Sequence, residues 1–341
     1  MKRVGVVGMG KMGIVHSAIL NALPDVELAA VMDKDKSLRQ YLYGMGIRAP
    51  FYHSLEEMLG KEKLDGVFAC VPSSTNYIVA KSCIERGISI FLEKPLANNL
   101  ANANKMMALV KDRKDIKHGV GFMMAYVPTF CHAKEVLQSA SLGEVREIRA
   151  SAYQSAVFSK QKSWFYKKEA AGGGAVTSLG SHLIFLLQWL FSPVRRVHEA
   201  SLAYSSGNEV EDAGRIELEM DGGVRATMDI SWSAPGYDNM ELDILVIASE
   251  GELRVTNQET VLQLKDEGVT RVHISELPDR AKFYLGGEGY CQEDEDFISC
   301  LGADKQPKVT WREGYWVQVV LDAIYRSAEA NQAVTLPGEI M

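Results

Sequence analysis

Short apolar runs alternate with stretches of helical periodicity over the first third of the chain. The apolar runs predict buried strands at 3–7, 27–32, 66–70, 88–92 and 117–121. Apolar residues at helical spacing predict helices between them, at 13–22, 36–43, 54–59, 75–86 and 98–111. This order predicts right-handed crossovers in a doubly wound parallel sheet, with a ligand crevice at the carboxyl ends of its strands.

A different rhythm begins near residue 125, where the predicted strands become longer and alternate polar with apolar side chains. They lie near 145–156, 213–220, 224–232, 240–248, 251–256, 261–265 and 270–275. Such strands predict an open, mostly antiparallel sheet with one face packed on helices. The alternation in Arg225–Trp232 is so regular that the other face needs a cover, and we expect a subunit partner there.

The change of rhythm divides this α/β protein into two expected domains, 1–122 and 123–341. A chain of 341 residues is long for a single core. Hydrophobic residues make up 47% of it and charged residues 24%, and its net charge is −7. This composition is that of a globular protein without the basic footprint of nucleic-acid binding.

The cysteines and the apolar runs predict a cytoplasmic location. The five cysteines have neither an even count nor CxxC spacing, which favours a reducing compartment and argues against structural zinc. No apolar run reaches the roughly 18 residues of a membrane-spanning helix, and the first strand begins at once, leaving no room for a signal peptide. We expect no membrane partner and, since no His, Cys or carboxylate cluster has ligand spacing, no metal.

Gly8, Gly10 and Gly13 lie between the first predicted strand and the helix that follows it. In this context they form the pattern that cradles a dinucleotide. Gly8 permits a tight turn, Gly10 lets a pyrophosphate approach the backbone, and Gly13 allows close contact between helix and strand. Lys11 and Met12 occupy the same turn and are expected to contact the cofactor as well.

Asp33 ends the second predicted strand, about 20 residues beyond the glycines, where a carboxylate can accept from both ribose hydroxyls. Its charge would repel a 2′-phosphate, so we expect NAD to be preferred over NADP. Lys34 follows directly and softens that repulsion, which leaves NADP open. The alternative is a glycine-rich turn in an unrelated α/β protein, with Asp33 as a helix cap.

Further motifs occur in an order typical of one enzyme family. The chain has Val-Gly-x-Gly-x-x-Gly-x-x-His at 7–16, then Glu93-Lys94-Pro95, a glycine triplet at 172–174 and His182. Over nearly its whole length it resembles the glucose–fructose oxidoreductase, inositol dehydrogenase and rhizopine-catabolism (Gfo/Idh/MocA) oxidoreductases. Other segments that carry the resemblance are Val71-Pro72, Val120-Gly121-Phe122, Trp164 and Asp322–Ala328.

The resemblance implies a Rossmann domain followed by an α/β domain whose large open sheet commonly forms homodimers or homotetramers. It implies hydride transfer between nicotinamide and the hydroxyl or carbonyl of a sugar, cyclitol or sugar derivative, nucleotide-sugars included. It adds Val71, Pro72, Asn76 and Glu93 to the residues expected to contact the cofactor.

Lys94 is the first expected catalytic residue. The resemblance places it beside the nicotinamide and the substrate oxygen, where a positive ring and partial burial would lower its pKa from about 10.4. It would orient the substrate hydroxyl and stabilise developing negative charge, while Glu93 steadies the turn. The alternative is a solvated surface lysine, which Pro95 disfavours by restraining the backbone.

His182 is the second expected catalytic residue, and the segment around it departs from the family. On one helix Ser178, His182 and Phe185 would share a face, and many relatives have aspartate where Ser178 and Phe185 stand. With a free pKa of about 6.5, His182 suits a general base for alcohol oxidation or an acid for carbonyl reduction. It lacks an orienting carboxylate, and Ser178 would orient it by a neutral hydrogen bond.

The expected substrate pocket also differs from the family pattern. Asn76 stands where relatives often have histidine, and Ala125 where they have arginine, so polar contacts to a sugar are lost. Tyr126 and Trp164 would offer flat faces to a sugar or cyclitol ring, although either is as readily a core residue. Four lysines within 159–168 would suit an anionic substrate, unless they form an ordinary solvated loop.

Three functions stay open on this basis. The first is an NAD-preferring dehydrogenase or reductase with Lys94 and His182 as the catalytic pair. The second, favoured by the missing aspartates, is an NAD-binding regulatory protein in which His182 is a structural histidine. The third is a redox-neutral lyase or glycosidase that keeps NAD bound and oxidises its substrate only transiently, as some relatives do.

Overall fold

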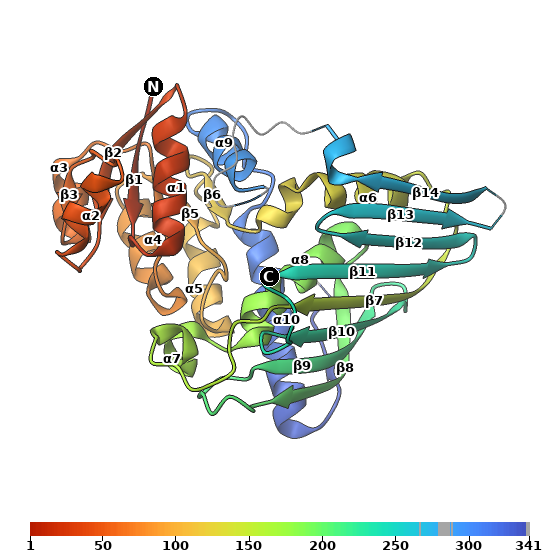
Figure 1. Ribbon diagram of the computed structural model, residues 1–341. Helices are drawn as coiled ribbons and strands as arrows, with labels where there is room; N and C mark the ends of the chain where they lie inside the picture. The colour runs from red at the N-terminus through yellow and green to blue at the C-terminus, as the bar shows by residue number, and fades with distance from the viewer. Residues whose placement is uncertain (266, 279–286, 288, 339–341) are drawn as a thin grey trace. The chain divides into compact units, whose positions relative to one another are not determined.

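The computed structural model describes residues 1–341 except 266, 279–286, 288 and 339–341, and the chain forms two compact units (Figure 1). The first unit comprises Met1–Met123 and Ala281–Tyr315, and the second comprises Met124–Arg280 and Trp316–Met341. The segment 281–315 therefore belongs with the N-terminal part of the chain, although it follows the strands of the second unit.

Parallel strands form the sheet of the first unit, in the order β3-β2-β1-β4-β5-β6. Their bounds are β1 Lys2–Val7, β2 Val26–Met32, β3 Phe51–Tyr52, β4 Gly66–Ala69, β5 Ser89–Leu92 and β6 His118–Val120. Because β1 pairs with both β2 and β4, the winding direction reverses between β1 and β4. Sheets of this topology bind ligands outside the carboxyl ends of their strands at that point.

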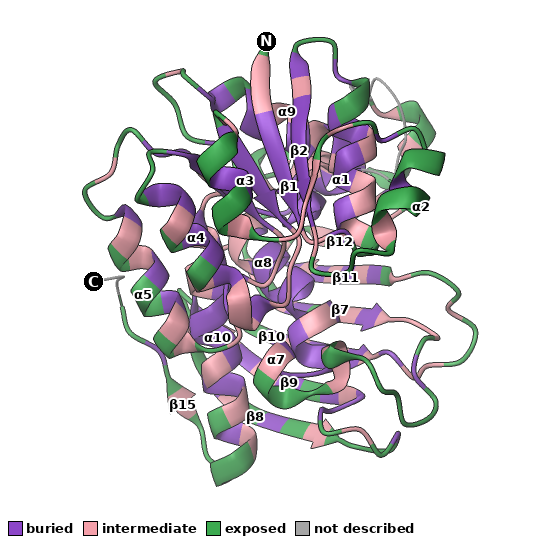
Figure 2. Cartoon of the chain, turned by 90° about the vertical axis from the view of Figure 1, so that its left-hand side faces the viewer, coloured by how far each residue is buried: buried purple, intermediate pink, exposed green. Residues whose placement is uncertain are grey.

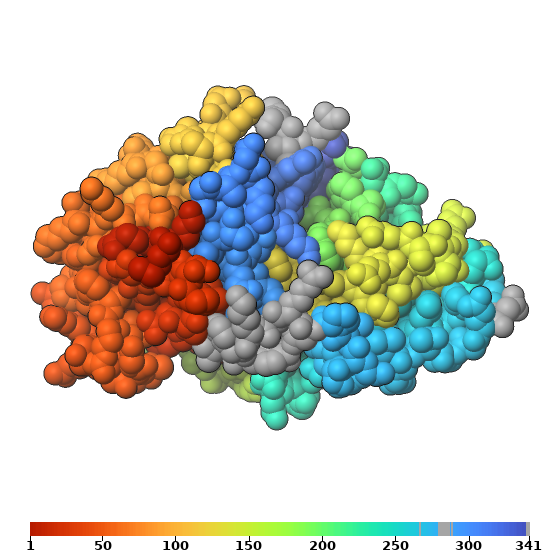
Figure 3. Space-filling view, turned by 90° about the horizontal axis from the view of Figure 1, so that it is seen from above, coloured from red at the N-terminus to blue at the C-terminus, as the bar shows by residue number. Residues whose placement is uncertain are grey.

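Helices cover this sheet, and its strands form the core between them. The helices are α1 Lys11–Ala22, α2 Leu38–Gly44, α3 Leu55–Lys61, α4 Asn76–Ile84, α5 Leu100–Val110 and α9 Tyr290–Cys300. Figure 2 shows β1 and β2 largely buried, whereas the outer surfaces of α2 and α3 are exposed. Leu20, Phe68 and Phe297 meet in this core. Accordingly α9 lies against α1, as the space-filling view also shows (Figure 3).

The second unit is built on a sheet in the order β14-β13-β12-β11-β7-β10-β9-β8-β15, in which only β7 and β10 pair in parallel. The bounds are β7 Val145–Tyr153, β8 Val194–Ala203, β9 Ala213–Met220, β10 Arg225–Ser231, β11 Glu241–Ala248, β12 Gly251–Thr256, β13 Glu259–Leu264, β14 Gly268–His273 and β15 Val334–Thr335. Figure 1 shows these strands side by side in front of α8 and α10.

One face of this sheet is apolar and packed, and the other carries polar side chains. In β10, Ala226, Met228 and Ile230 are buried, whereas the residues between them are not. The packed face meets helices, with α6 on β12 and β13, and α8 on β7. The helices of this unit are α6 Pro128–Gln138, α7 Lys168–Ala171, a π-helical turn Val176–Gly180, α8 Ser181–Leu190 and α10 Trp311–Ala330, which begins in the first unit.

The predicted fold class is confirmed: a doubly wound parallel sheet and a large, mostly antiparallel sheet in an α/β protein. The sequence pattern missed β8. Register shifts between Val194 and Arg196 and between Val197 and Glu199 bring Val194, Val197 and Ala200 to the buried face. Their spacing of three hides the period of two by which a strand is recognised.

Among the described residues, one helical stretch, 168–190, is long and apolar enough to pass for a membrane-spanning helix. The sequence pattern predicted no run of that length, and this stretch passes by length and composition only. Of its apolar window, 83% is buried inside the protein, as in a core helix. Gly172, with φ of +88°, and the π-helical turn divide it into shorter pieces.

Candidate functional site

The glycine loop after β1 has a steric reason for each of its glycines. A Cβ on Gly8 would lie 2.4 Å from the carbonyl oxygen of Cys70, and one on Gly13 would lie 1.8 Å from the carbonyl oxygen of Gly8. A Cβ on Gly10 would meet nothing within 4 Å. Packing therefore requires glycine at 8 and 13, whereas Gly10 keeps space free above the N-terminus of α1.

That N-terminus suits an anion. The first turn of α1 carries no acidic side chain, and no side chain caps it. The backbone N–H groups of a first helical turn have no intrahelical partner and bear a partial positive charge. The loop can therefore receive a pyrophosphate on Lys11, Met12 and Gly13.

The other expected cofactor contacts of the first unit follow the carboxyl ends of neighbouring strands. Asp33 follows β2, Val71 and Pro72 follow the β4 end, and Glu93 and Lys94 follow β5. Since the strands are parallel, these segments lie along one edge of the sheet with the glycine loop.

Asp33 already holds the glycine loop in place. Its Oδ2 accepts from the backbone N–H of Met9 at 2.7 Å, and its Oδ1 accepts from the N–H of Asp35 at 2.9 Å. A carboxylate has about four acceptor positions, so Asp33 retains capacity for ribose hydroxyls.

The Lys94 turn is fixed from both sides. The backbone N–H of Lys94 donates to Oε2 of Glu93 at 3.1 Å, and the Lys94–Pro95 peptide is cis. The buried Asn76 donates from Nδ2 to the carbonyls of Pro95 and Leu96, both at 3.2 Å. Asn76 thus secures the backbone after the lysine, a role that its position in the sequence did not suggest.

Lys94 is partly exposed at this edge, and burial of its ammonium group lowers its pKa while the Glu93 charge opposes the shift. A lysine whose pKa is lowered can exchange a proton nearer to neutral pH. The turn therefore presents a cationic group that is suited to orient a hydroxyl and to hold or release a proton.

In the second unit, the glycine triplet packs around a buried carboxylate. Oε1 of Glu211 accepts from the N–H of Gly174 at 2.8 Å, from the N–H of Val176 at 3.0 Å and from the hydroxyl of Tyr325 at 2.8 Å. A Cβ on Gly174 would lie 1.9 Å from the Glu211 carbonyl oxygen, and one on Gly173 would lie 1.9 Å from the Tyr325 hydroxyl. The triplet therefore allows close approach of protein groups.

Glu211 holds the start of the helix that carries His182. Burial raises the pKa of Glu211, and its hydrogen bonds to Tyr325 and the helix N–H groups oppose the shift. The sequence analysis did not identify Glu211 or Tyr325. A buried acid 37 residues from its glycine partner has no local signature.

The helix expected to carry Ser178, His182 and Phe185 on one face consists of two parts in the structure. Ser178 lies in the π-helical turn Val176–Gly180, whereas His182 and Phe185 lie in α8. Spacing of i and i+4 aligns side chains only where α-helical geometry continues. His182 and Phe185 are buried, and Ser178 is half-buried.

The two expected aromatic contacts differ in their surroundings. Tyr126 is half-buried in the turn Met123–Tyr126. Trp164 is 43% exposed, and its ring meets Phe165 edge-on at 5.7 Å. The rings of Phe165 and Tyr166 each lie 5.6 Å from that of Trp232, so these two residues tie the loop to the end of β10.

The expected site residues thus fall into two groups that are described separately. Lys94 and the expected cofactor contacts belong to the first unit. Tyr126, Trp164, Ser178 and His182 belong to the second unit.

One acidic cluster was not visible in the sequence. His16, Glu293 and Asp294 are buried, and their ligand-capable atoms lie within 4.8 Å of one another. Glu293 and Asp294 are neighbours in the sequence, but they lie 277 and 278 positions from His16, so no ligand spacing marks the cluster. The five cysteines are free, and burial raises the pKa of Cys70 to about 12.

Comparisons with known proteins agree with this architecture. A family model described as "Oxidoreductase family, NAD-binding Rossmann fold" matches residues 2–122, and one described as "GFO/IDH/MocA C-terminal domain" matches residues 130–254. Myo-inositol 2-dehydrogenase of Thermotoga maritima is 24% identical over 98% of both chains.

Solved structures share the whole fold. Levoglucosan dehydrogenase in complex with NADH and levoglucosan has a TM-score of 0.88 at 22% identity, covering 99% of this chain and all of that one. The WlbA dehydrogenase from Bordetella pertussis in complex with NADH and UDP-GlcNAcA has a TM-score of 0.83 at 23% identity, covering 99% of each chain. The chain belongs to the Gfo/Idh/MocA oxidoreductase family and carries that family's NAD-binding Rossmann domain.

Proposed function

We propose that this protein is an NAD-preferring dehydrogenase or reductase that acts on a hydroxyl or carbonyl of a sugar, cyclitol or sugar derivative. Residues 1–122 would bind the dinucleotide, and residues 123–341 would bind the substrate and form the oligomer. The observation that carries the proposal is the Lys94 turn, which follows β5 along the same edge as the glycine loop and holds a lysine of lowered pKa.

The residues present fit a dinucleotide. Gly10 leaves the N-terminus of α1 open, and Asp33 stands at the end of β2 with acceptor capacity left. The carboxylate favours NAD over NADP, because a 2′-phosphate would meet a like charge. When bound, the nicotinamide supplies the hydride acceptor or donor.

Lys94 and His182 are the proposed catalytic pair. The Lys94 ammonium would orient the substrate oxygen and stabilise its negative charge as the proton leaves. His182 would take that proton during oxidation or return it during reduction. With serine in place of the usual aspartate at 178, we expect a neutral hydrogen bond to orient the imidazole.

The substrate class rests on relatives. These relatives include myo-inositol 2-dehydrogenase, D-apiose dehydrogenase and levoglucosan dehydrogenase, each 24% identical to this chain. All three names denote dehydrogenases of a sugar, a sugar derivative or a cyclitol. Tyr126 and Trp164 are the proposed contacts for the flat face of such a ring.

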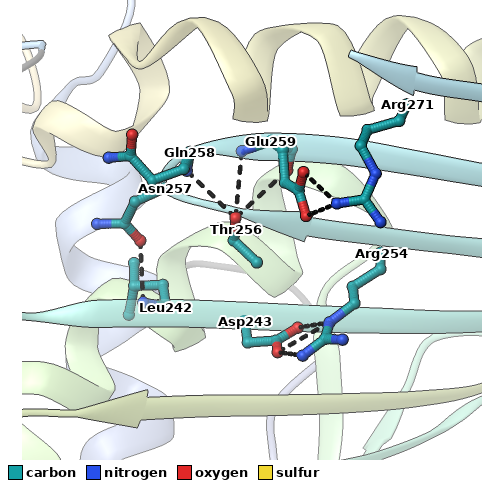
Figure 4. Close-up of polar contacts among 8 residues, drawn as sticks. All are labelled: Leu242, Asp243, Arg254, Thr256, Asn257, Gln258, Glu259 and Arg271. Atoms are coloured by element: carbon teal, nitrogen blue, oxygen red, sulfur yellow. Dashed lines mark hydrogen bonds and ion pairs between the residues drawn. The ribbon is translucent and has the colours of Figure 1, made fainter. Parts of the chain in front are cut away.

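We further propose that the protein forms homodimers or homotetramers through the open face of the large sheet. Ion pairs cross that face between neighbouring strands (Figure 4). Nε of Arg254 lies 3.0 Å from each carboxylate oxygen of Asp243, and a guanidinium nitrogen of Arg271 lies 2.7 and 2.6 Å from those of Glu259. Light scattering would show a monomer if this face stays uncovered.

We propose a cytoplasmic location, for which the support is that all five cysteines are free. A reporter fusion fractionated between cytosol and envelope would test it.

The central experiment has two steps. NADH and NADPH are titrated by fluorescence, and then sugars, cyclitols and nucleotide-sugars are tested for a change in reduced-nicotinamide absorbance. We expect tighter binding of NADH and turnover with one substrate class. Lys94→Ala and His182→Ala should lose turnover while keeping the fold and NADH binding.

Other outcomes would replace the proposal. Binding of NADH without turnover of any compound would favour a regulatory protein. Turnover of a substrate without net NADH, by a protein that purifies with its cofactor, would favour a redox-neutral lyase or glycosidase.

A further inference from the structure

His16 lies at the centre of a buried group of ionisable side chains in the first unit. It projects from α1 and is fully buried. The rings of Phe68, Phe91 and Tyr290 surround it, with centroids 5.6, 5.5 and 6.2 Å from its own. In such an apolar box an unpaired charge is costly, so the partners of His16 decide its state.

Each ring nitrogen of His16 faces a carboxylate. Nδ1 lies 2.8 and 3.0 Å from the two oxygens of Asp294, and Nε2 lies 3.0 Å from Oε1 of Glu93. A neutral imidazole has one N–H and can donate to only one of them. Two carboxylate acceptors therefore require an imidazolium.

The electrostatics agree with this assignment. Burial alone would lower the pKa of His16, but the Asp294 carboxylate raises it well above the usual 6.5. Burial also raises the pKa of Asp294, and the facing imidazolium opposes that shift. We assign the proton to His16, because Nε2 needs it to donate to Glu93.

The Glu93 carboxylate links His16 to the backbone of Lys94. Its Oε1 contacts His16, while its Oε2 accepts from the backbone N–H of Lys94 at 3.1 Å. The backbone N–H of Glu93 donates to the carbonyl of Ala69 at the end of β4, at 3.0 Å, so its main chain is fixed while His16 and the Lys94 N–H hold its carboxylate. A continuous path of hydrogen bonds thus runs from Asp294 through His16 and Glu93 to the lysine turn.

We propose that His16, as an imidazolium between Asp294 and Glu93, is a positioning residue for Lys94. It fixes the Glu93 carboxylate that holds the lysine turn, and its positive charge offsets the charge of that carboxylate next to Lys94. The inference rests on the proposed catalytic role of Lys94, but the structural link between His16 and Lys94 can be tested without turnover.

Burial disfavours the charged forms of the other titratable groups around His16. Burial raises the pKa of Cys70 to about 12 and raises the pKa of Tyr290 as well. Glu293 is 1% exposed, neither of its oxygens has a partner among the described residues, and burial raises its pKa well above the usual value. The close ion pairs of this group are those of His16 with Asp294 and with Glu93.

A divalent cation on His16, Glu293 and Asp294 is the competing explanation for the cluster. It would have to displace a proton from a ring nitrogen that already contacts a carboxylate. The two explanations predict different states of the imidazole, protonated on both nitrogens or metallated on one.

The first measurement needs no variant. Two-bond ¹H–¹⁵N spectra of the histidine rings in the intact protein, assigned with His16→Gln, should show both His16 nitrogens protonated at pH 8, where a free histidine is neutral. A neutral ring, or stoichiometric metal with a metallated nitrogen, would overturn the proposal.

The second measurement follows Lys94 by the NMR titration of its Cε–Hε signals. Loss of the imidazolium in His16→Gln leaves the Glu93 carboxylate next to Lys94 without its cation and should raise the Lys94 pKa. Loss of the carboxylate in Glu93→Gln should lower it. Glu293→Gln, the matched control, exchanges a neutral acid for a neutral amide beside Asp294 and should leave it unchanged.

The two titrations test the link between His16 and Lys94 whether or not a substrate is known. No shift of the Lys94 pKa in His16→Gln and Glu93→Gln would overturn the proposal. If His16→Gln does not fold, the ring is assigned by elimination from variants of the other histidines, and Glu93→Gln still tests the link.

Turnover adds a third readout once a substrate is found. Because misplacement by about 1 Å can cost roughly 10²-fold in rate, His16→Gln should lose about that much kcat. Its Kd for NADH should stay within about 2-fold of wild type. The pH dependence of its kcat should shift to higher pH, together with the Lys94 pKa. A purely structural role would weaken NADH binding and kcat together and leave the Lys94 pKa unchanged, and that result would contradict the proposal.

Discussion

Two glycine-rich segments open helices in this protein, and they do opposite things with the helix N-terminus. Before α1, Gly10 leaves open space, and no acidic side chain lies in the first turn. Before the helix that carries His182, Oε1 of Glu211 accepts from the N–H groups of Gly174 and Val176. The first N-terminus is left for an anionic ligand, whereas the second is filled by the protein's own carboxylate. A glycine-rich segment before a helix therefore indicates that some group approaches the backbone closely. It does not indicate whether that group is a ligand or part of the protein.

The two units also hold their buried carboxylates differently. Asp294 and Glu93 face a cation, His16, while the described partners of Glu211 are backbone N–H groups and a tyrosine hydroxyl. Pairing with a cation makes the first arrangement dependent on one proton. The second depends on the ionisation of Glu211 itself, whose pKa burial raises, while its backbone donors do not titrate.

The largest expected effect comes from filling the two tight glycine positions. Gly13→Ala and Gly174→Ala would each place a Cβ within 2 Å of a carbonyl oxygen, at 1.8 and 1.9 Å. Because backbone must shift in both cases, we expect each to lose about 3 kcal/mol of unfolding free energy. Urea unfolding would measure this, and an unchanged midpoint in either variant would show that the segment can yield.

A smaller effect is expected from Glu211→Gln. The amide keeps the shape of the side chain but loses the charge that faces the helix N-terminus, so we expect a loss of about 1–2 kcal/mol. Tyr325→Phe, which removes one of three donors to Glu211, should cost about 1 kcal/mol. Thermal unfolding of both variants tests this, and a larger loss in Tyr325→Phe would contradict the central role of Glu211.

The pH dependence of stability should distinguish the two arrangements. The folded-state pKa of His16 is raised above 6.5, so its stabilisation is complete below about pH 6.5 and is lost as pH rises through the folded pKa. We expect unfolding free energy to fall by up to about 1.4 kcal/mol per pH unit in that window. His16→Gln should lack this slope between pH 6.5 and 9, whereas Glu211→Gln should retain it. Equal slopes in wild type and His16→Gln would show that the imidazole is neutral.

The smallest expected change in stability is that of Gly10→Ala. Its φ of −73° is open to alanine, and the Cβ meets nothing within 4 Å, so stability should change by no more than about 0.5 kcal/mol. NADH affinity should nevertheless fall at least about 10-fold, because the methyl group occupies the space left for the pyrophosphate. Unchanged affinity in a fluorescence titration would mean that the loop does not hold the dinucleotide.

Local patterns in the sequence were sufficient for most of the fold. Strands β1, β2, β4 and β5 each bury a short apolar run, and the strands from β9 to β12 alternate side chains, so burial and period two identify them. These patterns do not identify β8, because its bulges interrupt the period of two. The glycine positions and the Glu93-Lys94-Pro95 turn could likewise be recognised, since each is contiguous.

Tertiary structure alone decided which distant groups meet. His16 and Asp294 are separated by 278 positions, and Glu211 and Tyr325 by 114, so no periodicity or spacing relates them. Folding brings them together because the segment 281–315 packs with the N-terminal unit and α10 crosses the second one. A buried charge needs its partner nearby in space rather than in sequence. For this reason the sequence determined where the candidate catalytic groups stand, and the fold determined what holds them and in which protonation state.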